Sequence, residues 1–160
     1  MIIGIAAIAK NYAIGKNGKL PWHYSADLKF FKQTTSGNAV VMGFNTWKSI
    51  GKPLANRLNI VLSRFANIEN QPTVLLMRSK DEVSALAKYL SCDLYVAGGA
   101  KTYENFSDVI EKWIVTEIPE NVEDADTFMP ANFLDGFEQK ETIEFAADLR
   151  AKIYEKKVQS

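Results

Sequence analysis

The sequence predicts an α/β fold in which one mixed, mostly parallel sheet carries helices on both faces. The chain has 160 residues, which is enough for one sizeable core. Short apolar runs alternate with segments of helical spacing up to residue 118, and this alternation is typical of parallel sheets. The last part of the chain lacks helical spacing. We therefore expect it to add antiparallel strands at one edge of the sheet.

The first half of the chain supplies three of the expected strands and two helices. The apolar segment 2–9 predicts a buried first strand. Residues 10–24 contain Gly15, Gly18 and Pro21, and a loop of this length in a small domain is usually functional. A helix is expected over residues 25–35, where Ser25 is a suitable cap. A short strand over 38–42, a helix from Gly43 to Ile50 and a strand over 58–63 follow.

The second half continues this alternation and then departs from it. Apolar runs predict strands at 73–77, 94–97 and 113–118. Helical spacing predicts a helix over 81–90, and a second is expected after Gly98-Gly99, to about residue 106. A long loop then leads to antiparallel strands near 137–145 and 150–158. No repeat or linker interrupts the chain, so residues 1–160 are expected to form one domain.

Composition and missing motifs exclude several function classes. The formal charge is zero and the lysines are scattered among acids, so we expect neither a nucleic-acid nor a membrane partner. One cysteine, Cys92, fits a reducing cytoplasm. The apolar start lacks a basic leader. No Gly-x-Gly-x-x-Gly follows the first strand, and with His23 as the single histidine we expect no metal site and no serine hydrolase.

Asp27 is the most informative residue of the chain. At about 100° per residue, it falls within an apolar arc formed by Ala26, Leu28, Phe30 and Phe31. A carboxylate on the buried face of a helix is costly unless it is paired, protonated or functional. The alternative is an ordinary first-turn acid that interacts with the helix dipole.

Two junctions between a strand and a helix carry glycine at the turn, at Gly43 and at Gly98-Gly99. Each offers free backbone N–H groups and a positive helix end, which suit phosphate. Two such junctions in one small domain indicate a ligand with a diphosphate. Arg64 and Arg78 end neighbouring strands, and their guanidinium groups suit a terminal phosphate.

Together these pieces closely resemble dihydrofolate reductase of the bacterial chromosomal type, over essentially the whole chain. The most specific stretches are Ile5-Ala-Ala, Ile14-Gly15, Leu20-Pro21-Trp22, Ala26-Asp27-Leu28-x-x-Phe31-Lys32, Val41-Met-Gly43, Thr46-Trp47-x-Ser49-Ile50-Gly51, Pro53-Leu54, Arg57, Asn59-Ile-Val-Leu-Ser63, Ala97-Gly98-Gly99, Tyr103 and Asp126-Thr127. The resemblance implies an enzyme that reduces 7,8-dihydrofolate to 5,6,7,8-tetrahydrofolate with NADPH as hydride donor, in the cytoplasm and as a monomer. It also implies a single-domain, eight-stranded mixed sheet with four flanking helices, and binding of antifolates such as trimethoprim or methotrexate.

The resemblance assigns roles to residues. Asp27 would hold the pterin and support protonation at N5 through a water near Trp22, with Thr116 bonded to the carboxylate and Leu20 in the mobile lid. Substrate contacts are implied for Ile5, Ala6, Ala7, Asp27, Leu28, Phe31, Lys32, Ile50, Leu54, Arg57, Ala97, Tyr103 and Thr116. Cofactor contacts are implied for Ala7, Ile14, Gly15, Gly43, Phe44, Asn45, Thr46, Leu62, Ser63, Arg64, Arg78, Gly98, Gly99, Ala100, Lys101, Thr102, Tyr103 and Thr127.

Three residues depart from the family pattern. Leu20 stands where many bacterial members have methionine, and Ala97 is smaller than the residue frequent there. Phe44 replaces the basic residue that contacts the 2′-phosphate of the cofactor, so Arg64 is expected to carry most of the phosphate recognition. Two alternatives remain at this point, namely the related reductase domain of riboflavin synthesis and a nucleotide-binding module without catalysis. The combination of Asp27, Trp22 and Thr116 favours the folate enzyme.

Overall fold

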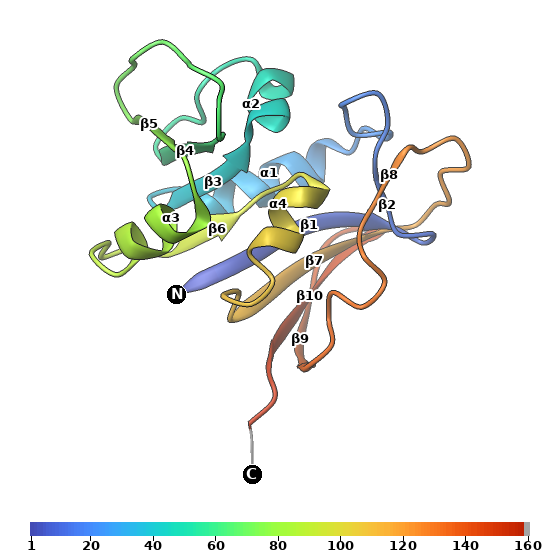
Figure 1. Ribbon diagram of the computed structural model, residues 1–160. Helices are drawn as coiled ribbons and strands as arrows, with labels where there is room; N and C mark the ends of the chain where they lie inside the picture. Colours follow the sequence, from blue (N-terminus) through green and yellow to red (C-terminus); the bar gives the residue numbers. More distant parts are fainter. Residues whose placement is uncertain (159–160) are drawn as a thin grey trace.

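The buried first strand, β1 (Ile2–Ala9), lies inside an eight-stranded sheet of order β5-β4-β3-β6-β1-β7-β10-β9. The computed structural model describes residues 1–158. β1 pairs in parallel with β6 (Leu94–Val96) and β7 (Lys112–Ile118), and on the far side of β6 come β3 (Ala39–Gly43), β4 (Leu58–Leu62) and β5 (Val74–Met77), also parallel. The mixed, mostly parallel sheet that the sequence predicts is confirmed (Figure 1).

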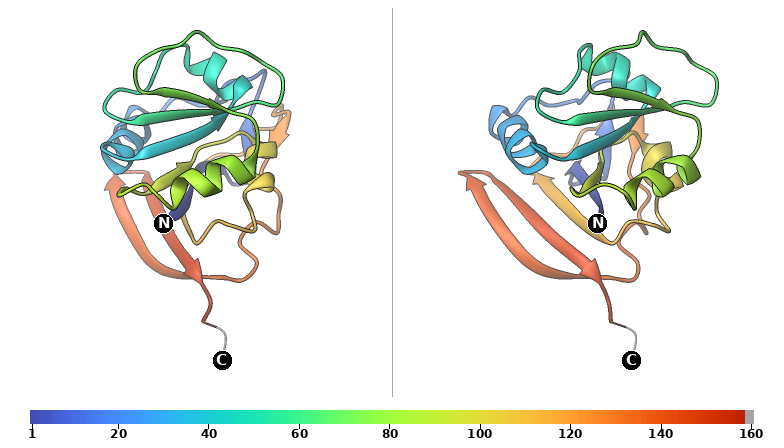
Figure 2. Two further views of the ribbon diagram at one scale, coloured as in Figure 1. Left: turned by 60° about the vertical axis from the view of Figure 1, so that its left-hand side comes forward. Right: turned by 90° about the vertical axis from the view of Figure 1, so that its left-hand side faces the viewer.

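The last strands form the antiparallel edge. β9 (Phe137–Ala146) pairs with β10 (Leu149–Lys156), and β10 continues the sheet against β7. Figure 2 shows the two strands side by side at the lower edge of the sheet, with the end of β10 leading to the C-terminus. β9 is the outermost strand of the sheet, and all ten of its residues are exposed or half-buried.

The helices divide between the two faces of the sheet. On one face, α1 (Ser25–Thr35) and α2 (Phe44–Ile50) pack Phe30, Phe31 and Trp47 against alternate residues of β1 and β3. On the other face, α3 (Lys80–Ala87) and α4 (Ala100–Asn105) pack Val83 and Tyr103 against the intervening residues. These four helices are the ones described in residues 1–158. Both α2 and α4 begin at the carboxyl ends of neighbouring strands, β3 and β6.

Three local expectations are corrected. Ser25 does not cap α1, because Tyr24 is the N-cap residue and its carbonyl accepts from the backbone N–H of Asp27 at 3.1 Å. The helix expected over 81–90 ends at Ala87. The loop 10–24 contains a short strand, β2 (Ala13–Gly15), which pairs with β8 (Thr127–Phe128). No helix in residues 1–158 has the length and apolar character needed to cross a membrane.

Candidate active site

A buried carboxyl group lies in the first turn of α1. Asp27 is 9% exposed and is the one buried acidic side chain in residues 1–158. Burial raises the pKa of the Asp27 carboxyl above its ordinary value, and hydrogen bonding by the hydroxyl of Thr116 on β7 opposes that rise. The prediction that Asp27 lies on the buried face of the helix is therefore confirmed, and Asp27 is not an ordinary solvated acid of a first helical turn.

The neighbouring wall is built by β1 and α4. Ala7 of β1 lies opposite Thr116 in the parallel register. The hydroxyl of Tyr103 donates to the carbonyl oxygen of Ile5 at 2.7 Å. Burial raises the pKa of Tyr103, and the negative charge of Asp27 adds to the effect. Tyr103 is therefore a neutral, fixed side chain on the wall. The structure gathers the residues expected around the pterin on neighbouring elements: Ile5, Ala6, Ala7, Ala97, Tyr103 and Thr116.

Trp22 closes the other side of this region from the loop before α1. Its side chain is buried and packs in a cluster with Ala13, Ile118 and Leu149. The indole Nε1 is buried and has no hydrogen-bond partner in residues 1–158. A buried indole N–H usually finds a partner, so this position suits a bound water or ligand atom.

A buried guanidinium lies at the opposite end of the α1 face. Arg57 is 7% exposed; its Nε donates to the carbonyl of Ala55 at 2.9 Å and its Nη1 to Thr35 Oγ1 at 3.0 Å. The guanidinium also lies 5.8 Å from the ring centre of Phe31. Burial lowers the pKa of Arg57. It pairs with no acid in residues 1–158, so it is a fixed cation available to an external carboxylate. Lys32, also predicted here, is exposed.

The surface between the acid and the guanidinium is apolar and open. Leu28 is 49% exposed and Ile50 is 38% exposed, whereas Leu54 is half-buried. Asn59 fixes Leu54 by exchanging hydrogen bonds with its backbone, at 2.8 and 3.0 Å. The sequence reasoning gave Asn59 no role, although a polar residue inside an apolar strand was a usable signal. Leu20, in the expected lid, is 50% exposed.

The two glycine junctions meet in space. The backbone N–H of Gly43 donates to the carbonyl of Gly98 at 2.9 Å, and the Gly98–Gly99 peptide bond is cis. A Cβ on Gly43 would lie 2.9 Å from Thr102 Oγ1, so a side chain there would crowd α4. Neither α2 nor α4 has a side-chain cap or an acidic residue in its first turn. Two free helix N-termini therefore lie side by side, an arrangement that suits a diphosphate.

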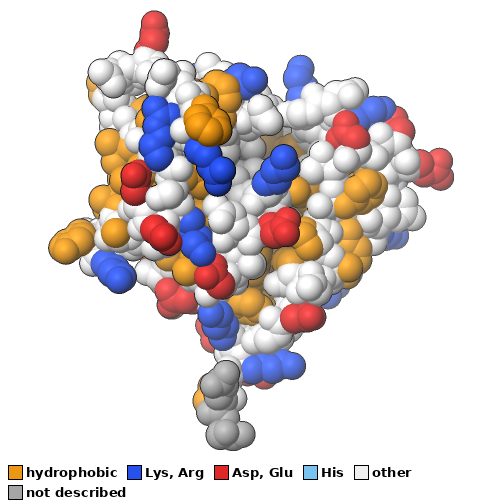
Figure 3. All heavy atoms as spheres, in the orientation of Figure 1, with side chains coloured by type: hydrophobic (Ala, Val, Ile, Leu, Met, Phe, Trp, Pro, Cys, Tyr) orange, Lys and Arg blue, Asp and Glu red, His pale blue; other side chains and the backbone are white. Residues whose placement is uncertain are grey.

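The basic residues near this edge differ in their surroundings. Arg64 and Lys101 are exposed and make no hydrogen bond or ion pair within residues 1–158. Arg78 is also exposed, but its guanidinium is bonded to the turn after β4. Figure 3 shows Lys and Arg side chains beside hydrophobic ones over this upper part of the molecule. The expected phosphate site thus has free cations at Arg64 and Lys101.

Phe44 is half-buried at the start of α2, with Lys48 Nζ 4.9 Å from its ring centre. It lines a hollow of about 400 Å³ on the outer side of α2, and a second hollow of about 300 Å³ lies between residues 23–26 and 146–149. Neither hollow contains Asp27 or Arg57. The buried charges, and not the size of a hollow, identify the site.

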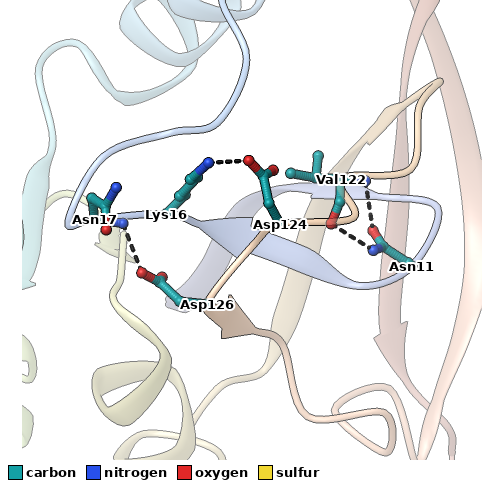
Figure 4. Close-up of polar contacts among 6 residues, drawn as sticks. All are labelled: Asn11, Lys16, Asn17, Val122, Asp124 and Asp126. Atoms are coloured by element: carbon teal, nitrogen blue, oxygen red, sulfur yellow. Dashed lines mark hydrogen bonds and ion pairs between the residues drawn. The ribbon is translucent and has the colours of Figure 1, made fainter.

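The loop 10–24 is tied to the segment 120–129 (Figure 4). The amide N–H of Asn17 donates to Asp126 at 2.8 Å, and Lys16 forms an ion pair with Asp124. Asn11 exchanges hydrogen bonds with the backbone of Val122, at 3.0 and 3.3 Å. The partners are more than a hundred residues apart in the chain, so no local pattern indicated these contacts.

Comparisons with known proteins agree with this geometry. A family model described as dihydrofolate reductase matches residues 1–159. A dihydrofolate reductase of Bacillus subtilis is 37% identical over 118 residues, covering 74% of this chain and 69% of that protein. One of Haemophilus influenzae is 35% identical over 128 residues, covering 79% and 76%.

A solved structure is also similar over nearly its full length. It is a dihydrofolate reductase from Enterococcus faecalis in complex with NADP(H) and RAB-propyl, with a TM-score of 0.89 and 31% identity, covering 98% of this chain and 96% of that one. With a family model spanning residues 1–159 and relatives of 35–37% identity, the chain belongs to the dihydrofolate reductase family.

Proposed function

We propose that this chain carries out the reaction of its family, the NADPH-dependent reduction of 7,8-dihydrofolate to 5,6,7,8-tetrahydrofolate, in the cleft between Asp27 and the Gly43 and Gly98-Gly99 junctions. The observation that carries the proposal is the burial of Asp27, a single acid on an apolar wall. A hydride acceptor needs a water-excluding pocket with polarity only where the substrate has polar atoms. This arrangement meets that need.

The pterin is assigned to the Asp27 end. Its amino group and N3 would donate to the Asp27 carboxylate, while Thr116 keeps that carboxylate oriented. The wall is proposed to consist of Ile5, Ala6, Ala7, Ala97 and Tyr103. Burial raises the pKa of the Asp27 carboxyl, so this group takes up a proton more readily than a solvated aspartate, which suits a role in proton transfer.

The rest of the substrate is assigned to the open apolar surface. Leu28, Phe31, Ile50 and Leu54 would contact the aminobenzoyl ring. Arg57 would receive the α-carboxylate of the glutamate, because it is buried and held by Ala55 and Thr35 without an acidic partner in residues 1–158. Lys32 would add positive charge at the exposed end.

The residues present fit NADPH at the glycine junctions. The free N-termini of α2 and α4 would hold the diphosphate, and the crowding that a Cβ would cause at Gly43 is consistent with close approach to backbone. Residues assigned to this cofactor are Ala7, Ile14, Gly15, Gly43, Phe44, Asn45, Thr46, Leu62, Ser63, Arg64, Gly98, Gly99, Ala100, Lys101, Thr102, Tyr103 and Thr127. Bound NADPH supplies the hydride, and Arg64 would bind its 2′-phosphate.

Protonation of N5 is assigned to Asp27 and Trp22 acting together. The buried Nε1 of Trp22 has no partner in residues 1–158, so it can hold a water that passes a proton towards N5. Leu20, half exposed in the lid, would cover the site and exclude bulk water when the loop closes.

The chain is proposed to act as one domain over residues 1–160, as a cytoplasmic monomer. Antifolates such as trimethoprim or methotrexate would place a diaminopyrimidine edge against Asp27. Loss of NADPH absorbance on addition of dihydrofolate tests the function. No loss with folded protein would favour a nucleotide-binding module, and comparison with NADH measures the cofactor preference.

A further inference from the structure

The turn that follows β4, residues 63–67, is held by one side chain. Arg78 Nη1 donates to the carbonyl oxygens of Ser63 at 3.2 Å and Ala66 at 2.6 Å, and Nη2 donates to Asn67 Oδ1 at 2.8 Å. We call residues 63–67 the β4 turn. Leu62 lies opposite Met77 in the parallel register, so the turn and Arg78 leave the sheet as neighbours.

The charge of Arg78 is directed at this turn. Within residues 1–158, all the hydrogen bonds of the guanidinium are with neutral oxygens of the β4 turn, and no acid pairs with the side chain. Glu82 instead accepts from the backbone N–H of Arg78 at 3.0 Å. A planar guanidinium with donors in fixed directions fixes three points of a turn at once. Lysine, with a single ammonium on a flexible stem, does not reproduce this pattern.

The β4 turn in return presents Arg64 to solvent. The backbone N–H of Ala66 donates to Ser63 Oγ at 3.0 Å, which closes the turn from inside. Arg64 lies within this closed turn, and its own side chain is exposed and makes no hydrogen bond or ion pair in residues 1–158. The backbone below Arg64 is therefore fixed while its guanidinium is available to a ligand.

We propose that Arg78 is a positioning residue for the cofactor and not a phosphate ligand: it holds the β4 turn so that Arg64 meets the 2′-phosphate of NADPH. This rests on the proposed cofactor site, and it revises the expectation that Arg78 contacts the cofactor. Without Arg78, the turn has to become ordered when NADPH binds. Ordering of this kind costs about two- to tenfold in affinity.

Dissociation constants for NADPH and NADH test the proposal, measured by quenching of tryptophan fluorescence. The proteins are wild type, Arg64→Ala, Arg78→Ala, Arg78→Lys and the double Ala variant. Arg150→Ala is the matched control, because Arg150 is an exposed arginine of β10 that pairs with Glu117. Arg78→Ala should weaken NADPH about two- to tenfold and leave NADH unchanged. Arg78→Lys should resemble Arg78→Ala, and the double variant should be no weaker than Arg64→Ala.

Other outcomes overturn the proposal in distinguishable ways. Arg78→Lys with the NADPH affinity of wild type would mean that Arg78 acts by its charge on the phosphate. The same follows if the affinity losses of Arg64→Ala and Arg78→Ala multiply in the double variant. Equal weakening of NADPH and NADH would mean a general loss of structure, which melting curves report separately. If Arg64→Ala leaves NADPH affinity unchanged, Arg64 does not bind the 2′-phosphate, and both that assignment and the positioning role of Arg78 are wrong. Normal turnover at saturating NADPH would then still support the reductase.

Discussion

The proposed substrate half and the proposed cofactor half of the site are built in different ways. In the substrate half, Asp27 and Arg57 are buried charges fixed by Thr116, Thr35 and the backbone of Ala55. In the cofactor half, binding is assigned to helix N-termini and exposed side chains on turns. Removing a buried charge leaves other groups unpaired, whereas removing an exposed one loses a single contact. The consequences of substitution should therefore decrease from the first half to the second.

The largest expected effect is that of Asp27→Asn on turnover. The amide has nearly the same shape but cannot exchange a proton or pair ionically with a protonated pterin. Acid–base assistance of this type contributes about 10²–10⁴-fold, and a loss in that range is expected at neutral pH. Steady-state rates with saturating NADPH check it. A near-wild-type rate would remove Asp27 from the mechanism.

The same variant should not lose stability. Burial raises the folded-state pKa of Asp27, so the folded protein binds more protons than the unfolded chain between the two pKa values. The free energy of unfolding consequently falls as pH rises through that window. Asn carries no such charge, so its melting temperature at neutral pH should equal or exceed that of wild type. A clearly lower value would mean that the carboxylate is structural.

Arg57→Ala should come next in size. A charge-assisted hydrogen bond from a buried group contributes about 1.5–3 kcal/mol, or roughly ten- to a hundredfold in affinity for dihydrofolate. A pterin without the glutamate lacks that contact and should bind the variant and wild type alike. Titration of both ligands against both proteins separates the cases. If the two affinities fall together, Arg57 serves the fold through Thr35 and not the substrate.

Trp22→Phe is expected to lower turnover about two- to tenfold, the contribution of one hydrogen bond. Phe keeps most of the apolar contact but lacks the N–H, whose nitrogen has no protein partner in residues 1–158. Melting should therefore shift little. Paired kinetic and melting measurements decide this. A large drop in melting temperature with unchanged turnover would show that Trp22 is only a core residue.

The smallest effect is expected where the loop 10–24, the proposed lid, contacts the segment 120–129. Asp124 is exposed, and Lys16 lowers its pKa through their hydrogen bond and charge. Solvent screens such a pair, so Asp124→Asn should change turnover by at most about fivefold. Added salt should make wild type resemble the variant. A salt-independent loss would indicate that Asp124 acts by another route.

Periodicity predicted most of the fold, because apolar spacing reports directly on which residues are buried. It placed β1, α1 and the glycine junctions, and it put Asp27 on a buried face. Periodicity did not predict contacts between distant segments. Lys16 and Asp124, for example, are brought together by the pairing of β2 with β8. Arg78 shows a second limit. Its position at a strand end does not indicate that its guanidinium donates hydrogen bonds to the β4 turn.

The pH dependence of the hydride-transfer step tests the central role of Asp27 most directly. Single-turnover rates of wild type and Asp27→Asn are measured with saturating dihydrofolate and NADPH from acidic to alkaline pH. The wild-type rate should fall as pH rises, with a midpoint above the ordinary range of an aspartate, because burial raises the pKa of this carboxyl. The variant should be slower at neutral pH, should lose its rate at a lower pH, and should approach wild type only in acid. Superimposable profiles for the two proteins would contradict the account.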